Sequence, residues 1–397
     1  MHISHMLIDG TSVSSRKVDT IFNPASGEPV AGVAVGGREE ARLALEAAKR
    51  AFPVWSSMPA EERSEVLREA ARLVRQRRDE IARLLTLEQG KPLKSSRSEV
   101  LSAADVLDYY AEEGKRNTGQ WLAGPHSRSI VLWQPIGVAA LITPWNYPVD
   151  LLSWKVAPCL AAGCTFVSKP PSLAPLAATE FVRAVSDAGL PAGAANVVHG
   201  PGGTAGAELV ESPISRKIAF TGETATGRAV MAAAAARIKR ISLELGGQSP
   251  FIVCADADLP AAAASAAHRA FSNMGQICVS VNRIYVADEV AEAFTDQLVS
   301  LAESLKIGDG MQPGVELGPM FSSQQREKTK EHVADALERG AELLAGGSEP
   351  EGEEFSRGFF FRPTVLGRAD HSMRVMREET FGPVAPIMKF KSVQEAV

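Results

Sequence analysis

Short apolar runs alternate with longer helical stretches through the middle of the chain. Five such runs cover residues 138–142, 165–168, 196–198, 217–220 and 241–243. This alternation is typical of a parallel sheet with helices on both faces, in which ligands bind beyond the carboxyl ends of the strands. We therefore predict an α/β fold with a doubly wound parallel sheet and a functional site along the strand ends.

The residues ahead of this sheet change from alternating to helical periodicity. Residues 1–35 alternate apolar and polar positions around turns at Asn23–Pro24 and Ser26–Gly27, which predicts an opening hairpin. Helices are predicted over about 39–52 and 96–113. Between them we predict one long helix whose apolar face holds residues 67, 71, 74, 81 and 85.

Two further stretches complete the pattern. From 124 to 138 the chain becomes rich in branched and aromatic residues, which predicts an exposed strand pair around 126–135. A lone pair of strands is only marginally stable, so we expect this ribbon to pack against something else. After the sheet, we predict a strand, two helices and a second β-rich stretch at 283–286, 290–305, 324–339 and 359–366.

Composition narrows the functional classes. The 397 residues exceed what a single core supports, so two or more domains are expected. The 42 basic and 47 acidic side chains are nearly balanced, and no basic run is interleaved with aromatic residues. Nucleic acid and anionic membranes are therefore poor candidate partners.

Location and metal content follow from a few residue types. The first six residues lack the features of an export signal, and no apolar run reaches the roughly 18 residues that span a bilayer. The four cysteines form no CxxC pair, and the seven histidines show no metal-ligand spacing. We therefore predict a cytoplasmic protein without a metal.

Three separated residues have side chains suited to acyl transfer. The Cys278 thiolate can attack a carbonyl, the Glu244 carboxylate can activate water, and the Asn146 amide can hold an oxyanion. Each alone has a structural explanation as a buried hydrophobe, a paired core acid or a turn former. Yet Asn146, Lys169, Gly222 and Glu244 all follow predicted strands, which places them along one edge of the sheet.

Two glycine-rich segments could bind a phosphate. Residues 200–205 fit the pattern G-x-G-x-x-A only weakly. Residues 220–227 are the better candidate, because a strand ends in glycine there and the free amides of a helix N-terminus follow. Lys169 precedes Pro170-Pro171, a rigid segment that would direct its ammonium group at a ribose or phosphate.

Six segments together resemble, in sequence and order, the signature segments of the aldehyde dehydrogenase superfamily. They are Pro144–Pro148, Ser168–Pro170, Phe220–Gly227, Leu243–Gly247, Gly275–Cys278 and Glu379–Val384. The resemblance extends from about Ile21 onward, and 241–286 and 307–319 look most similar to semialdehyde-oxidising members. Family members also continue beyond the position of Val397, so the catalytic domain is expected to be incomplete at its C-terminus.

The resemblance implies a catalytic cycle in two halves. Cys278 corresponds to the nucleophile, and it follows Glu244, the general base, by 278 − 244 = 34 residues, as in the family. Asn146 and the Cys278 N–H would stabilise the thiohemiacetal oxyanion, with Lys155 as an electrostatic helper. Hydride transfer leaves a thioester, which water activated by Glu244 would hydrolyse. His268 is an alternative papain-like base, although its alanine-rich helix favours a structural role.

The family binds NAD or NADP, and the resemblance implies which residues would hold it. Ser172 replaces a glutamate frequent in NAD-preferring relatives, so NADP should be tolerated or preferred. Glu223 stands where serine is frequent, and we expect it to point outward. The expected cofactor-binding residues are Thr143, Pro144, Trp145, Lys169, Ser172, Gly202, Gly206, Phe220, Gly222, Glu223, Thr224, Gly227, Leu245, Glu379 and Phe381.

Substrate specificity is inferred from two positions. Semialdehyde-oxidising relatives use arginines to bind a distal carboxylate, whereas this chain has Trp154 and Ser272 there. Trp154, Tyr147 and Phe271 instead suggest an aromatic tunnel for uncharged or aromatic aldehydes, with a core tryptophan as the alternative. A succinate-semialdehyde-type enzyme, a CoA-acylating enzyme and a dinucleotide-binding homologue without activity remain alternatives, and Glu244 argues against the CoA-acylating one.

By this resemblance the chain has three parts. Residues 1–115 and 139–245 would form the dinucleotide-binding domain, and 246–397 the catalytic domain. Residues 116–138 would form a ribbon that joins subunits into a homodimer or homotetramer.

Overall fold

A computed structural model describes residues 2–397, which divide into two compact units. Unit 1 comprises the residues up to Ile21 together with Pro29–Glu88 and Lys94–Leu245. Unit 2 comprises Phe22–Glu28, Gln89–Leu93 and Gly246–Val397. None of the helices in residues 2–397 is long and apolar enough to cross a membrane.

Unit 1 is built on a seven-stranded sheet in the order β12-β11-β8-β9-β10-β2-β3. The first five strands are parallel, and they coincide with the five predicted apolar runs. This confirms the α/β fold class. In sheet order the strands are Arg240–Leu245, Ser215–Gly222, Val138–Ile142, Thr165–Lys169, Ala195–Val197, Met6–Ile8 and Thr11–Val13.

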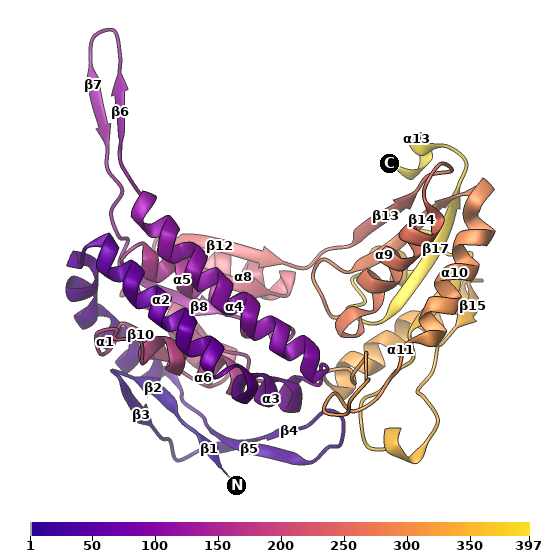
Figure 1. Ribbon diagram of the computed structural model, residues 1–397, viewed down its shortest axis with the longest axis horizontal. Coiled ribbons are helices and arrows are strands. Elements are labelled where there is room, and N and C mark those ends of the chain that lie inside the picture. The colour runs from indigo at the N-terminus through magenta and orange to yellow at the C-terminus, as the bar shows by residue number, and fades with distance from the viewer. Residues whose placement is uncertain (1) are drawn as a thin grey trace. The chain divides into compact units, whose positions relative to one another are not determined.

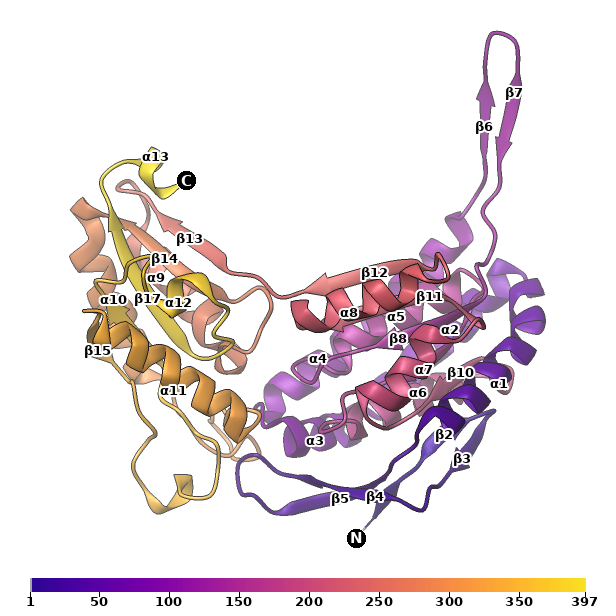
Figure 2. The same cartoon turned by 180° about the vertical axis from the view of Figure 1, so that it is seen from behind.

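Helices cover both faces of this sheet. On one face α1, α7 and α8 pack on the strands, and on the other α5 and α6 do so with α2 outside them (Figures 1 and 2). Every residue of β8, β9 and β10 is buried, as expected for parallel strands covered on both sides. Helices α1 to α8 span Arg38–Ser57, Ala60–Gln76, Arg78–Gln89, Leu93–Glu113, Asp150–Ala161, Leu176–Ser186, Ala207–Glu211 and Thr224–Ala235.

The strand order creates a switch point between β8 and β11. From β8 the chain continues to β9 and β10 on one side, and it then returns to β11 and β12 on the other. Loops leaving β8 and β11 diverge to opposite faces there, which makes this the preferred ligand position in open α/β sheets.

Two predictions about the helices of the N-terminal half need correction. The predicted long helix is two helices, α2 and α3, which separate at Arg77 where no glycine or proline marks the break. Arg77 has ψ near 10° and pairs with Asp187 at 2.7 Å, so tertiary packing sets this boundary. Helix α1 also continues through Pro53 to Ser57, beyond the predicted end.

The opening residues form more than one hairpin. Strands β2 and β3 are a hairpin that extends the main sheet, whereas β1, β5 and β4 form a separate sheet from Ile3–Ser4, Pro29–Ala34 and Val18–Phe22. The ribbon is an antiparallel pair of β6 (Gln120–Ala123) and β7 (Arg128–Val131), so it starts before the predicted residue 124 (Figure 1). Its Trp121, Leu122 and Ile130 are exposed.

Unit 2 contains a five-stranded sheet in the order β13-β14-β17-β16-β15. The strands span Ser249–Val253, Val281–Ala287, Val384–Phe390, Thr364–Gly367 and Glu342–Ala345. Its helices are α9 to α13, at Leu259–Phe271, Ala291–Ser304, Ser323–Glu338, Arg374–Arg377 and Val393–Ala396. The predicted elements at 283–286, 290–305, 324–339 and 359–366 correspond to β14, α10, α11 and β16.

Short helical turns join these elements. Single 3-10 turns lie at Gly114–Arg116, Ser272–Gly275, Asp288–Val290 and Glu353–Phe355, and a π turn lies at Gly202–Gly206. Unit 2 has its own core, in which Phe271, Phe294 and Phe361 are fully buried.

Candidate active site

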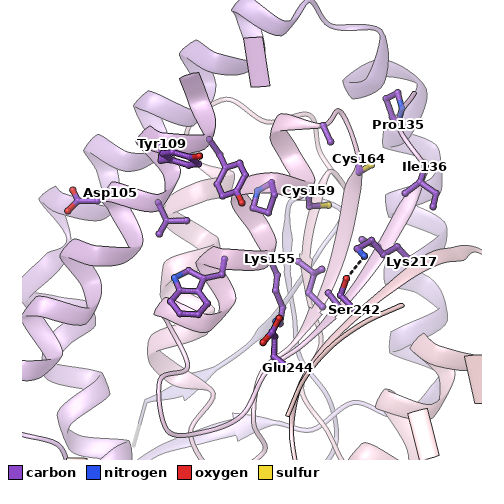
Figure 3. A pocket seen from close by; sticks show the side chains of 18 of the residues that line it. Asp105, Tyr109, Pro135, Ile136, Lys155, Cys159, Cys164, Lys217, Ser242 and Glu244 are labelled. Carbon is purple, nitrogen blue, oxygen red and sulfur yellow. Dashed lines mark hydrogen bonds between the residues drawn. The ribbon is translucent and has the colours of Figure 1, made fainter. Parts of the chain in front are cut away.

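A pocket of about 840 Å³ lies on one face of the unit 1 sheet (Figure 3). Its floor is formed by residues of β8, β11 and β12, and its walls by α4 and α5. The apolar lining includes Leu141, Trp154 and Tyr109, and the polar groups include Lys155 and Glu244. A concave, mostly apolar surface with a few converging polar groups is typical of a small-molecule site.

Lys155 is the buried cation of this pocket. Its ammonium Nζ donates a hydrogen bond of 2.6 Å to Oγ1 of Thr221, and in the parallel register Thr221 lies opposite Glu244. Burial lowers the pKa of Lys155 to about 8, while the Glu244 carboxylate partly opposes this shift. Figure 3 shows the two side chains together at one end of the pocket. Lys155 from α5 and Glu244 from β12 therefore lie at the same end of the pocket.

Thr221 was not predicted as a site residue from the sequence. The one feature that could have indicated it is its position, one residue beyond the predicted run 217–220.

Asn146 lies in the turn after β8, at the switch point, and is only 3% exposed. The start of α5 is anchored by Glu99, whose Oε1 accepts hydrogen bonds from the N–H groups of Val149 at 3.0 Å and Asp150 at 3.3 Å. Glu99 is buried in α4, and this role was not predicted from the sequence. The buried carboxylate fixes the segment that carries Asn146 and Tyr147.

Lys169 and Ser172 converge on one carbonyl group. The Lys169 ammonium donates to the Gly200 oxygen at 3.2 Å, and the Ser172 hydroxyl donates to the same oxygen at 3.1 Å. A Cβ on Gly206 would lie 3.5 Å from the Lys169 side chain, so the 202–206 turn also lies against this lysine. Burial lowers the pKa of Lys169 to about 8. The structure thus gathers Lys169, Ser172, Gly202 and Gly206 at one place.

The second glycine segment joins β11 to α8. Gly222 and Gly227 lie close to neighbouring side chains, since added Cβ atoms would approach the Phe220 ring to 2.7 Å and Leu245 to 2.6 Å. Glu223 is the N-cap residue of α8, but its exposed side chain makes no capping hydrogen bond. The twelve-residue helix, which starts at Thr224, therefore directs uncapped amides outward. Free amides at the start of a helix can bind a phosphate group.

The remaining residues expected near the cofactor in unit 1 border the switch point. The Thr143 N–H donates to the Lys169 carbonyl at 3.4 Å, which links the ends of β8 and β9. Thr143 is buried, and Pro144 and Trp145 are half-buried.

In unit 2, Cys278 follows a strained turn. Asn273, Met274 and Gly275 have φ angles of 50°, 59° and 66°, a left-handed run that side chains other than glycine rarely adopt. Gly275 approaches Gly382 so closely that a Cβ would come within 2.1 Å of the Gly382 oxygen. Such strain persists only where the surroundings fix it, and it is common at functional sites. Cys278 itself is half-buried.

The same contact brings a second predicted segment to this turn. Phe381, which precedes Gly382, has a φ of 54°, and its carbonyl accepts a hydrogen bond of 3.0 Å from Gln325. Glu379 lies against Gly246, because a Cβ there would be 2.2 Å from the Glu379 carboxylate. Unit 2 therefore places the Cys278 turn beside the 379–382 segment.

The three proposed tunnel residues have different environments. Trp154 is 52% exposed and lines the pocket, so the alternative of a core tryptophan is wrong. Tyr147 is half-buried in the Asn146 turn, whereas Phe271 is 1% exposed in the core of unit 2. The exposed His268 forms a 3.1 Å hydrogen bond with Ser272.

Replacing Gly275 with alanine should destabilise unit 2 by about 3 kcal/mol, because the new Cβ combines an unfavourable positive φ with a clash against Gly382. Thermal unfolding followed by circular dichroism would measure the effect. Gly247→Ala is the matched control, since a Cβ there would meet no atom within 4 Å. Equal unfolding temperatures for the two variants would contradict a strained turn.

Comparisons with known proteins agree with these features. The family model described as "Aldehyde dehydrogenase family" matches residues 11–397. The chain is 44% identical over 395 residues to succinate-semialdehyde dehydrogenase [NADP(+)] of Escherichia coli, covering 98% of this chain and 81% of that protein. It is 44% identical over 394 residues to glutarate-semialdehyde dehydrogenase of Pseudomonas aeruginosa, with 98% and 81% coverage.

The chain is also similar in fold to a solved structure. A crystal structure of an E. coli NADP-dependent enzyme superposes with a TM-score of 0.96 at 43% identity, over 99% of this chain and 82% of that one.

Proposed function

Since this chain belongs to the aldehyde dehydrogenase family, we propose that it oxidises an aldehyde to a carboxylic acid with NAD or NADP as the hydride acceptor. The observation that supports this most directly is that the buried Lys155 ammonium and the Glu244 carboxylate lie at the same end of one pocket. A carboxylate next to a buried cation is well suited to act on water at a thioester.

In the proposed mechanism, the Cys278 thiolate attacks the aldehyde carbonyl. The Asn146 side-chain amide and the Cys278 backbone N–H donate hydrogen bonds to the oxyanion of the thiohemiacetal. When bound, a nicotinamide cofactor would supply the acceptor for the hydride. Glu244 then removes a proton from water, which hydrolyses the Cys278 thioester and releases the acid. The positive charge of Lys155 lies in the same pocket as the Glu244 carboxylate and attracts it.

We propose that the cofactor is held at the unit 1 strand ends and by two residues of unit 2. The amides at the start of α8 would face the pyrophosphate, and Lys169 and Ser172 would contact the adenosine ribose. Glu379 and Phe381 would hold the nicotinamide end. Ser172 places no negative charge near a 2′-phosphate, which supports binding of NADP.

NADP affinity should fall as pH rises through about 8. The Lys169 pKa is lowered to about 8 by burial, so its ammonium is charged below that pH and loses its charge above it. The charged ammonium attracts a 2′-phosphate. Loss of that positive charge should weaken NADP binding about tenfold between about pH 7 and about pH 9.5. Fluorescence titration of NADP would measure this.

NAD, which lacks the 2′-phosphate, provides the control and should show a much flatter profile. Lys169→Arg should flatten the NADP profile as well, because an arginine does not lose its proton in this range. A parallel pH dependence for both dinucleotides would argue against contact between Lys169 and the 2′-phosphate.

We further propose that the substrate is an uncharged or aromatic aldehyde. The exposed Trp154 ring and Tyr109 give the pocket an aromatic wall, and Ser272 cannot pair with a carboxylate. The alternative is a semialdehyde, as the names of the E. coli and P. aeruginosa relatives suggest. In that case the pocket's Lys155 or Lys217 would have to attract the distal carboxylate.

Trp154→Arg should raise kcat/KM for succinate semialdehyde relative to benzaldehyde by about tenfold or more. A guanidinium on the pocket wall can form a charge-assisted pair with the distal carboxylate, which the indole cannot. Steady-state kinetics with both aldehydes measure the ratio. Trp154→Phe keeps an apolar wall and should leave the ratio near that of the parent. A parent enzyme that already prefers succinate semialdehyde would support the alternative substrate.

For the domain organisation, we propose that 1–115 and 139–245 bind the dinucleotide and that 246–397 carry the nucleophile. The exposed Trp121, Leu122 and Ile130 of the ribbon support a role for 116–138 in subunit contacts, giving a homodimer or homotetramer. Light scattering would test the oligomeric state.

The four free cysteines of the chain suit a reducing cytoplasm.

An absorbance assay of cofactor reduction with a panel of aldehydes tests the proposed activity. Turnover without added CoA is expected, since Glu244 supplies the base for hydrolysis. Turnover only with CoA would indicate an acylating dehydrogenase. Dinucleotide binding without turnover of any aldehyde would indicate a binding protein and contradict the proposal.

A further inference from the structure

Two cysteines close the C-terminal end of α5. The Cys164 N–H donates to the Cys159 carbonyl at 2.9 Å, and the Gly163 N–H donates to the Leu160 carbonyl at 2.9 Å. Gly163 has a φ of 77°. These bonds and the left-handed glycine define a Schellman turn, in which the side chains at the positions of Cys159 and Cys164 commonly contact each other.

The turn brings the two cysteines close together. The Cys159 Sγ donates a hydrogen bond of 3.7 Å to the carbonyl of Thr165, next to Cys164, and the backbone bond between Cys159 and Cys164 holds their Cα atoms within roughly 7 Å. This separation is close to the range that a disulfide spans. Both cysteines are free thiols, and both line the pocket of unit 1 (Figure 3). A small reagent that enters the pocket can therefore reach both cysteines.

The surroundings favour a thiolate on Cys164. The neighbouring Cys159 thiol is the main cause that lowers the pKa of Cys164 to about 6, although burial opposes it. Backbone N–H groups of Gly137 and Ile136 and the charge of Arg63 act in the same direction as the Cys159 thiol. The same pairing raises the pKa of Cys159 well above its usual value. Cys164 is thus the nucleophile of the pair, and Cys159 is the neighbouring thiol that can attack Cys164 once it is oxidised.

We propose that Cys159 and Cys164 are a redox-active dithiol that a hydroperoxide converts reversibly to a disulfide. The Cys164 thiolate attacks one peroxide oxygen, so an S–O bond forms, the O–O bond breaks and the leaving oxygen takes up a proton. The Cys159 sulfur then attacks the Cys164 sulfenic acid. An S–S bond forms, the S–O bond breaks and water leaves with the Cys159 proton. Two thiols are oxidised, and hydrogen peroxide is reduced to two waters.

The two cysteines are distinct from the proposed nucleophile of aldehyde oxidation. They belong to unit 1, whereas Cys278 and Cys254 belong to unit 2. Within the described part of the chain, Cys254 is half-buried and is not hydrogen-bonded to another cysteine, so it serves as the internal comparison.

The sequence allows a direct test. Trypsin cleaves after Lys155 and Arg183 but not before Pro170, so residues 156–183 form one peptide whose only cysteines are Cys159 and Cys164. The full chain would be treated with hydrogen peroxide, blocked with iodoacetamide, digested and analysed by mass spectrometry. We expect a peptide that is two hydrogen atoms lighter and carries no alkyl group. Reduction with dithiothreitol before blocking should restore double alkylation.

Variants make the assignment specific. Cys159→Ser should abolish the lighter peptide and leave Cys164 to be oxidised further, whereas Cys254→Ser should leave the disulfide yield unchanged. A Cys278→Ser background removes competition from the proposed catalytic thiol. The proposal is overturned if both cysteines of 156–183 stay fully alkylated in the unsubstituted chain when Cys254 is already oxidised. It is also overturned if Cys164 reaches the sulfinic acid there without any disulfide.

Discussion

Cys278→Ala should lower aldehyde oxidation by at least about ten-thousand-fold, because no other group can form the thiohemiacetal in the proposed mechanism. The small alanine side chain fits the half-buried position, so the fold and dinucleotide binding should be retained. Steady-state absorbance measures the loss of kcat/KM, and fluorescence titration measures cofactor binding.

Cys254→Ala provides a matched control, since Cys254 is also a half-buried thiol of unit 2. It should leave kcat within about twofold of the parent, as expected for a substitution away from the reacting atoms. Residual activity of Cys278→Ala above a few per cent would remove Cys278 from the role of nucleophile. The dithiol of α5 would then be the next sulfur to examine.

Glu244→Gln should separate the two halves of the reaction. Thioester formation does not need a carboxylate at this position, but the amide cannot take a proton from water, so hydrolysis should slow by about a hundred- to ten-thousand-fold. Rapid mixing should show one burst of reduced cofactor per active site, followed by very slow turnover. Intact-mass measurement should show the acyl group retained on Cys278.

Glu223→Gln is the control, because it removes an exposed carboxylate from the neighbouring strand-to-helix turn of unit 1. That variant should keep full turnover and bind the dinucleotide at least as well as the parent, since a negative charge near the pyrophosphate is lost. If Glu244→Gln shows neither burst nor acyl adduct, Glu244 acts before the thioester forms and the proposed role is wrong.

Sequence patterns predicted the parallel sheet of unit 1 well because each strand is buried on both faces. Runs such as 138–142 and 165–168 are continuous blocks of apolar or small residues, and both proved to be strands of the sheet centre. Boundaries set by tertiary contacts were harder. The separation of α2 from α3 at Arg77 has no local sequence signal, and it coincides with an ion pair to a residue 110 positions away.

The candidate site was predictable only in part for a similar reason. Residues at strand ends, such as Lys169 and Glu244, were found from their position after apolar runs. Partners that join distant elements carried no such signal, among them Thr221 with Lys155 and Glu99 with the start of α5. The contact of Gly275 with Gly382 likewise depends on two loops more than 100 residues apart. Such pairings require the folded chain.

Helix α5 joins several of these features in one rigid body. Trp154 and Lys155 lie on it, Glu99 fixes its first turn, and the Cys159–Cys164 turn ends it. Moving or tilting this helix would shift the pocket wall, the buried ammonium and the thiol pair together. Substitutions made along α5 to broaden substrate range should therefore combine non-additively, and a double-mutant cycle between its two ends would register a coupling energy despite their separation.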